Sequence, residues 1–162
     1  MKIILFLLIF FFQSCAYKPL YEKNNLISNY KINLIIKSKE KYGNDASLFR
    51  LLLKNNLNYQ AKKPSQLKLV VSLEKYKINL GINKDLSTSG ISLRYIVNYS
   101  FYDKLGLLLS GSFSKESSYN LTKNAYGNLV SNEDSSKKLI KSLSETLAYT
   151  IITSKFKRKV SP

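Results

Sequence analysis

The chain contains one cysteine, Cys15, and no histidine. Catalysis by a histidine base is therefore excluded, and any thiol chemistry would depend on that single residue. The acidic side chains are scattered along the chain, and helix capping accounts for adjacent pairs such as Glu133-Asp134. Without histidine or further cysteine, the ligand types that most metal sites use are missing. We expect no enzymatic activity, no metal and no cofactor.

Cys15 directly follows an apolar segment that is typical of an export signal. Lys2 supplies a positive charge, and residues 3–12 form an unbroken run of ten apolar residues, whereas a helix that spans a membrane needs about 20. The sequence Gln13-Ser14-Cys15-Ala16 resembles a bacterial lipobox. An unpaired cysteine in an exported chain also calls for a modification. We predict a lipoprotein signal peptide over residues 1–14 and lipidation of Cys15.

The lipobox resemblance implies a particular anchor and location. A single group that carries two acyl chains would be attached to the Cys15 sulfur, and a further fatty acid such as palmitate to the new amino group. Because each buried methylene contributes about 0.8 kcal/mol, two or three chains hold a protein durably on a membrane. Ala16 stands where an aspartate commonly retains such proteins in the inner membrane. We therefore expect a lipid-anchored protein on the periplasmic face of the outer membrane.

The formal charge of +16, from 26 basic and 10 acidic residues, favours an anionic partner. Nucleic acid, anionic lipid and an acidic protein surface all fit this charge. Only Arg50, Arg94 and Arg158 are arginines, and nucleic-acid recognition uses arginine heavily because its planar group bonds phosphates and guanine edges bidentately. We therefore expect no nucleic acid as a partner. An AT-rich genome is an alternative explanation for the many lysines.

The remainder of the chain is long enough for one domain with a core. We place a linker over residues 15–29, the domain over 30–157 and a basic tail over 158–162. Alternation predicts a first strand over 30–36, and a helix over about 46–58 follows, capped by Asn44 or Asp45. A second helix is predicted to run to about Lys155 after capping groups at residues 131–134.

Three further strands are predicted between the two helices. The inward face of the first, over 67–82, changes near Glu74-Lys75, which indicates either a bulge or a strand that leaves the covered part of the sheet. The next strand alternates cleanly from Ile91 to Phe101, and Asp103–Gly106 forms a hairpin turn before the return strand. The order predicts an α+β fold with two helices on one face of a four-stranded sheet, either antiparallel or mixed and mostly antiparallel.

Three segments of the chain resemble the LPS-assembly lipoprotein family LptE in its alphaproteobacterial form. The first is the mature start, Cys15-Ala16-Tyr17-Lys18-Pro19-Leu20-Tyr21, and the second runs from Thr88 to Tyr99, where a turn and an arginine lead into an alternating strand. The third is the run before the last helix, Ser117–Asn120 followed by Asn124-Ala125-Tyr126. The expected order of helices and strands also agrees with this family.

The resemblance implies a lipoprotein that binds the barrel protein LptD, plugs its lumen and helps to assemble lipopolysaccharide (LPS) at the cell surface. It also implies binding to LPS itself. Turns at the ends of the sheet can project cations, so we select Lys84, Lys104 and the intervening Arg94 as candidate LPS-binding residues. A generic periplasmic lipoprotein of another envelope-assembly or cell-wall-binding complex would share the anchor, charge and fold, and this alternative stays open.

Overall fold

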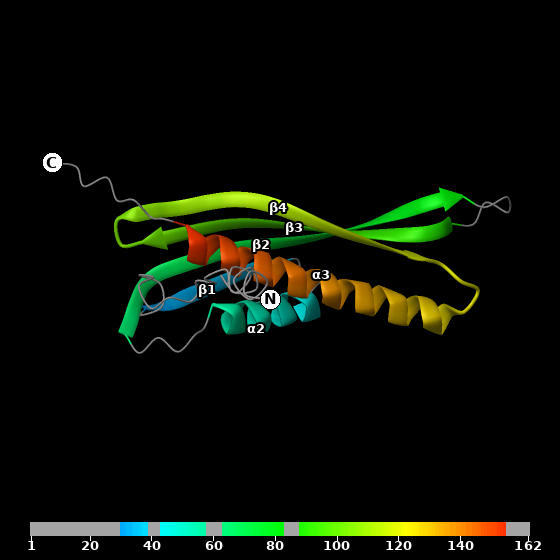
Figure 1. The fold of residues 1–162 in the computed structure, drawn as a ribbon, viewed down its shortest axis with the longest axis horizontal. Helices are drawn as coiled ribbons and strands as arrows, with labels where there is room; N and C mark the ends of the chain where they lie inside the picture. Colours follow the sequence, from blue (N-terminus) through cyan, green and yellow to red (C-terminus); the bar gives the residue numbers. More distant parts are fainter. Residues whose placement is uncertain (1–29, 39–42, 58–62, 83–87, 155–162) are drawn as a thin grey trace, which may run out of the picture.

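Four strands and two helices form the part of the protein that the computed structural model describes, residues 30–38, 43–57, 63–82 and 88–154 (Figure 1). In chain order they are β1 (Tyr30–Ser38), α2 (Gly43–Asn56), β2 (Lys63–Ile82), β3 (Thr88–Asp103), β4 (Gly106–Asn120) and α3 (Ala125–Thr153). The predicted α+β fold and its element order are confirmed. The predicted signal peptide, the linker and the basic tail over 158–162 lie outside the described residues.

The sheet is mixed and has the strand order β1-β2-β3-β4. β1 runs parallel to β2, with Ile32 opposite Leu67 and Ser38 opposite Leu73, while β2–β3 and β3–β4 are antiparallel. A parallel pair needs a crossover connection, and α2 lies between these two strands in the chain. We call the end of the sheet with the Asp103–Gly106 turn the hairpin end, and the opposite end the far end.

The core lies between the sheet and the two helices, which cover the same face of it (Figure 1). β3 follows the predicted alternation, because Tyr95 and Val97 are fully buried whereas Asn98 is exposed. Burial of about 25 cal/mol per Å² of apolar surface makes this layer the main source of stability. Its largest fully buried side chains are Tyr95, Phe49, Phe101, Leu53, Leu69, Leu73, Leu93, Ile140, Leu143, Leu147, Ile151 and Val71.

β2 leaves the covered part of the sheet, as one of the two alternatives predicted. Its register with β3 is continuous from Lys68 opposite Tyr102 to Leu80 opposite Gly90, so no bulge interrupts it near Glu74. The apolar side chains that follow therefore point away from the helices. These are Tyr76, Ile78 and Leu80, which are 47%, 39% and 38% exposed.

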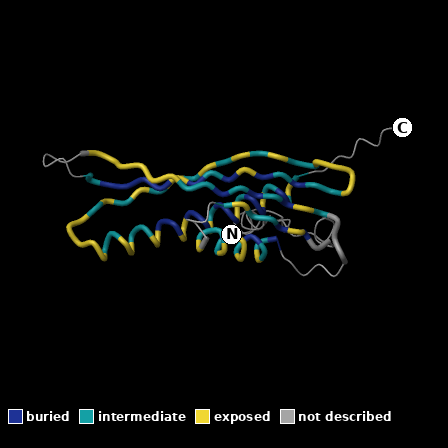
Figure 2. Tube along the Cα trace, turned by 180° about the vertical axis from the view of Figure 1, so that it is seen from behind, coloured by how far each residue is buried: buried dark blue, intermediate teal, exposed yellow. Residues whose placement is uncertain are grey.

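α3 begins at Ala125, ahead of the capping groups predicted at residues 131–134, and this part of the prediction is wrong. The Asn124 side-chain oxygen accepts hydrogen bonds from the N–H groups of Tyr126 and Gly127, at 3.0 and 3.1 Å. It thereby satisfies the first free N–H groups of the helix. The early turns of α3 are largely exposed, and burial begins at Ser135 (Figure 2).

The acidic pair once expected to cap this helix lies on its exposed side instead. Glu133 approaches Lys137 at 3.8 Å and Asp134 approaches Lys138 at 2.7 Å, each one turn further along. Such exposed pairs contribute only a few tenths of a kcal/mol. Glu133 and Asp134 thus stabilise α3 weakly from within the helix and do not cap its N-terminus.

Candidate functional site

The structure describes two of the four residues singled out from the sequence. Cys15, the predicted lipidation site, and Lys84, a candidate LPS-binding residue, lie outside the described residues. Arg94 lies in β3 opposite Tyr76 and Glu116, and Lys104 is exposed in the hairpin turn. That turn is held by Asp103, whose side-chain oxygen accepts from the N–H groups of Leu105 and Gly106 at 2.8 and 3.0 Å.

Arg94 forms an ion pair across the β3–β4 ladder. Its Nε and Nη2 donate to Oε2 of Glu116 at 2.9 and 2.7 Å, and the Ser92 hydroxyl donates to Oε1 of the same carboxylate at 2.5 Å. The hydrogen bond from Ser92 and then those from Arg94 hold the pKa of Glu116 below its ordinary value. Arg94 therefore presents a largely neutralised charge to an incoming anion.

Arg94 and Lys104 do not belong to one local site. Lys104 is at the hairpin end, whereas Arg94 lies closer to the far end, where β2 finishes and β3 begins. The 16 residues of β3 correspond to a length of roughly 50 Å at the usual rise of a strand. Arg94 and Lys104 therefore lie apart along the sheet, and one small ligand would not contact both.

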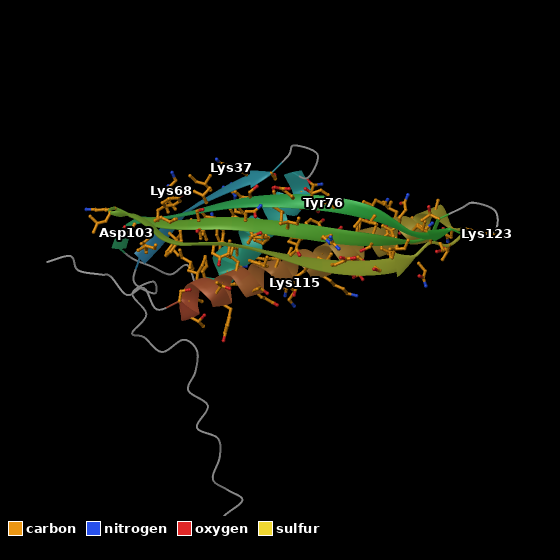
Figure 3. The ribbon with its side chains drawn as sticks, turned by 90° about the horizontal axis from the view of Figure 1, so that it is seen from above. Lys37, Lys68, Tyr76, Asp103, Lys115 and Lys123 are labelled. Atoms are coloured by element: carbon orange, nitrogen blue, oxygen red, sulfur yellow. The ribbon has the colours of Figure 1, made fainter. Side chains whose placement is uncertain are left out.

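The sheet face opposite the helices, which we call the open face, is left uncovered by the described elements (Figure 1). Lys37 of β1 and Lys68 of β2 lie on it, and Figure 3 shows them near one end of the sheet. Neither lysine has a carboxylate partner within the described ranges. The exposed apolar residues of β2 lie on the same face nearer the far end, and serines of β4 occupy its border. They are Tyr76, Ile78, Leu80, Ser110, Ser112, Ser114 and Ser118.

A half-buried polar cluster on the helix side was missed by reasoning from the sequence. Lys75 Nζ lies 3.0 Å from Oδ2 of Asp45 and 3.2 Å from the Ser136 hydroxyl. The Tyr95 hydroxyl donates to the same Asp45 oxygen at 2.6 Å, and Lys75 Nζ also lies 5.3 Å from the centre of the Tyr95 ring. The cluster joins α2, β2, β3 and α3, so we assign it a structural role.

Asn44 or Asp45 was expected to cap the first helix, and for this reason the contact between Asp45 and the sheet was not anticipated. The helix begins at Gly43, so Asp45 lies in its first turn and its carboxylate bonds to the sheet. Lys75 interrupts the apolar alternation of β2, and that break was the only signal in the sequence that a partner was present. A buried charge requires such a partner because desolvation without one is costly.

Two chemical possibilities find no support in the described part of the chain. No group of three or more His, Cys, Asp and Glu residues is placed to hold a metal ion within those ranges. Among the same residues, no helix is both long and apolar enough to cross a membrane. The open face, with its lysines and exposed apolar side chains, is the surface best suited to binding.

Solved structures that resemble this protein include three bacterial lipoproteins. A candidate lipoprotein from Caulobacter crescentus has a TM-score of 0.57 at 18% identity and covers 75% of this chain and 88% of its own. A minor lipoprotein from Acinetobacter baumannii has a TM-score of 0.56 at 16% identity, with coverage of 78% and 92%. Rare lipoprotein B from Shewanella oneidensis has a TM-score of 0.49 at 16% identity, with coverage of 74% and 90%.

No protein-family model matches the sequence, and no curated protein matches it significantly. The Caulobacter and Acinetobacter structures each align over most of both chains. At these identities the likeness concerns the fold alone, and it shows that this chain folds as these two bacterial lipoproteins do.

Proposed function

We propose that this protein is an outer-membrane lipoprotein, anchored through Cys15 on the periplasmic face, that plugs an LptD-like barrel and assists the assembly of LPS. The three sequence segments that resemble LptE support this proposal. The single structural observation that carries it is the open face. It presents exposed apolar side chains together with lysines that have no carboxylate partner among the described residues.

The charge of the described residues favours an acidic partner. The carboxylates of Asp45 and Glu116 are occupied by Lys75 and Arg94, and Glu74 accepts a hydrogen bond from the Tyr76 hydroxyl at 2.7 Å. Other cations remain without a carboxylate partner among the described residues and face solvent: Lys37, Lys68, Lys104 and Lys123. Positive charge of this kind attracts phosphorylated glycolipid or an acidic protein wall.

The direction of the strands is compatible with a domain that extends away from its lipid anchor. Cys15 precedes β1, whose first residue Tyr30 pairs with Lys63 at the start of β2. β2 begins at the hairpin end, because its early residue Lys68 lies opposite Tyr102. A tether that enters at this end leaves the length of the sheet free to extend from the membrane into a partner.

Co-purification from native membranes tests the partner. A tagged full chain, extracted in mild detergent, should recover a large outer-membrane barrel in near-equal amount. Reversing two open-face charges, Lys37→Glu with Lys68→Glu, should lower recovery several-fold, whereas Lys141→Glu on the exposed side of α3 should leave it unchanged. Recovery of a different envelope complex in place of a barrel would instead support the generic lipoprotein alternative.

Titration with LPS at moderate salt tests the second part of the proposal. The mature chain should bind LPS, and Lys84→Glu with Lys104→Glu should weaken binding several-fold. Arg94→Ala should have a smaller effect, because Glu116 already neutralises that guanidinium. Binding that the lysine reversals leave untouched would remove Lys84 and Lys104 from the site, and absence of any binding would remove LPS as a ligand.

A further inference from the structure

β4 turns one side of its backbone away from the sheet. It is the last strand in the sheet order, and none of its residues is buried. The Leu121 N–H donates to the Ser89 carbonyl at 3.0 Å, in the same register that places Tyr119 opposite Ile91. Bonded pairs alternate along an antiparallel ladder. The odd-numbered residues of β4 from Leu109 onward therefore direct their N–H and C=O groups towards β3.

The even-numbered residues of β4 must then direct their N–H and C=O groups outward, and five of them follow one another in regular register. They are Ser110, Ser112, Ser114, Glu116 and Ser118. No backbone hydrogen bond to these outward groups is present among the described residues. Four of the five side chains are small hydroxyl groups, which leave room beside the strand.

Other unpaired borders of the sheet carry features that discourage strand pairing, and β4 does not. β1 contains the exposed Lys37, and the part of β2 beyond β1 contains Lys77 and a positive-φ glycine, Gly81. Lysines and backbone irregularities of this kind protect exposed edges. β4 has no proline, and its single lysine, Lys115, is turned to α3.

The two charged side chains of β4 are both bound within the protein. Lys115 Nζ donates to the Ser142 hydroxyl at 2.7 Å and to the Ser142 carbonyl at 3.3 Å, while Glu116 is held by Arg94 and Ser92. Neither charge is therefore free to discourage another strand from pairing with the β4 edge. The C-terminal end of α3 lies beyond the border of β4 when the sheet is viewed from above (Figure 3), so a strand added there would have a helix beneath it.

We propose that the β4 edge binds an extended segment of another protein by strand addition, with the outward groups of Ser110 to Ser118 forming the new ladder. Lys104 and Lys123, which lie just before and just after β4 in the chain and are both exposed, favour a segment with net negative charge. A second copy of this chain fits poorly, because its formal charge of +16 would repel that of the first copy. The inference does not depend on whether the partner is a barrel.

Site-specific photo-crosslinking in native membranes tests this edge. A photoreactive residue is placed in turn at Ser110, Ser112 and Ser114 of the full chain, and at Asn98 as a control that is exposed on the same face in β3. Strand addition predicts crosslinks to one partner segment, shifting by two residues for each step of two in β4, with little product from Asn98. Crosslinks that scatter, join two copies of this chain, or form equally at Asn98 would overturn it.

A proline substitution removes an outward donor without touching the β3–β4 ladder, because proline is tolerated where a strand N–H faces solvent. Ser112→Pro with Ser114→Pro should lower recovery of the crosslinked partner about tenfold, whereas the matched alanine pair should not. Both proteins should keep the wild-type melting temperature within a few degrees. Unchanged recovery with the proline pair would contradict the inference. If a barrel is recovered but the crosslinks do not shift in steps of two residues, the proposed function stands and strand addition is contradicted. If the crosslinks shift in this way along a different partner, strand addition stands and the proposed function is contradicted.

Discussion

Lys75 and Asp45 face each other across the interior, with Nζ and Oδ2 3.0 Å apart and side chains only 18% and 21% exposed. Asp45 also accepts the Tyr95 hydroxyl at 2.6 Å. One carboxylate in the first turn of α2 thus joins that helix to two neighbouring strands. The contact is long-range in the chain, and it explains how a lysine is accommodated beside the core.

Removing this carboxylate charge should destabilise the domain. Asp45→Asn leaves the Lys75 ammonium partly buried without its counter-charge, which should cost about 1–3 kcal/mol. Lys77→Met, which changes an exposed lysine on the same strand, should cost much less. Chemical denaturation compares the two variants, and equal losses would show that the Lys75–Asp45 pair contributes nothing particular.

The two faces of β3 should respond very differently to a new charge. Val97→Asp places an unpaired carboxylate in the core and should destabilise the domain by about 3–5 kcal/mol, whereas Asn98→Asp on the exposed face should change stability by less than about 0.5 kcal/mol. Thermal melting measures both. Similar shifts for the two variants would mean that the buried face of the strand is assigned wrongly.

The lowered pKa of Glu116 predicts a dependence of stability on pH. Hydrogen bonds from Ser92 and Arg94 favour the ionised carboxylate, so its contribution is fully present above the ordinary pKa of 4.5. It is lost as the pH falls through the lowered value. Glu116→Gln should therefore melt below the wild type at pH 7, with a gap that narrows below about pH 4. A gap that stays constant down to pH 3 would contradict this linkage, and Glu145→Gln provides a control.

Local patterns in the sequence predicted more of the fold than long-range contacts did. The alternation from Ile91 to Phe101 and the Asp103–Gly106 turn depend on neighbouring residues, and both were correct. The start of α3 was wrong because Asn124 and the group at 131–134 contain equally good capping side chains, and a short pattern does not distinguish them. The parallel pairing of β1 with β2 was left open, since it depends on a crossover that no short pattern encodes.

The arrangement of the candidate site could not be predicted from the sequence. Lys104 is exposed as expected, while the anionic partner that the surplus of lysine indicated stays a prediction. The pairing of Arg94 with Glu116 spans 22 residues in sequence and arises only from the register between β3 and β4. A sequence cannot reveal which cations are already neutralised, and for that reason Arg94 and Lys104 looked alike.

Lipidation of Cys15 should be visible directly. Mass spectrometry of the protein purified from membranes should give an acylated N-terminal peptide that begins at Cys15, and the lipid chains should hold the protein in the membrane fraction. Cys15→Ser should prevent processing and acylation. A Cys15→Ser protein with unchanged mass, processing and membrane association would rule out this anchor.

The most direct test of the proposed role is the arrival of newly made LPS at the cell surface after the protein is depleted. Labelling with an impermeable reagent should show that surface LPS falls several-fold as the protein disappears, and the wild-type chain supplied in trans should restore it. Depletion of an unrelated outer-membrane lipoprotein serves as the control. Surface LPS that continues to arrive at the normal rate, with the protein fully depleted, would contradict the account.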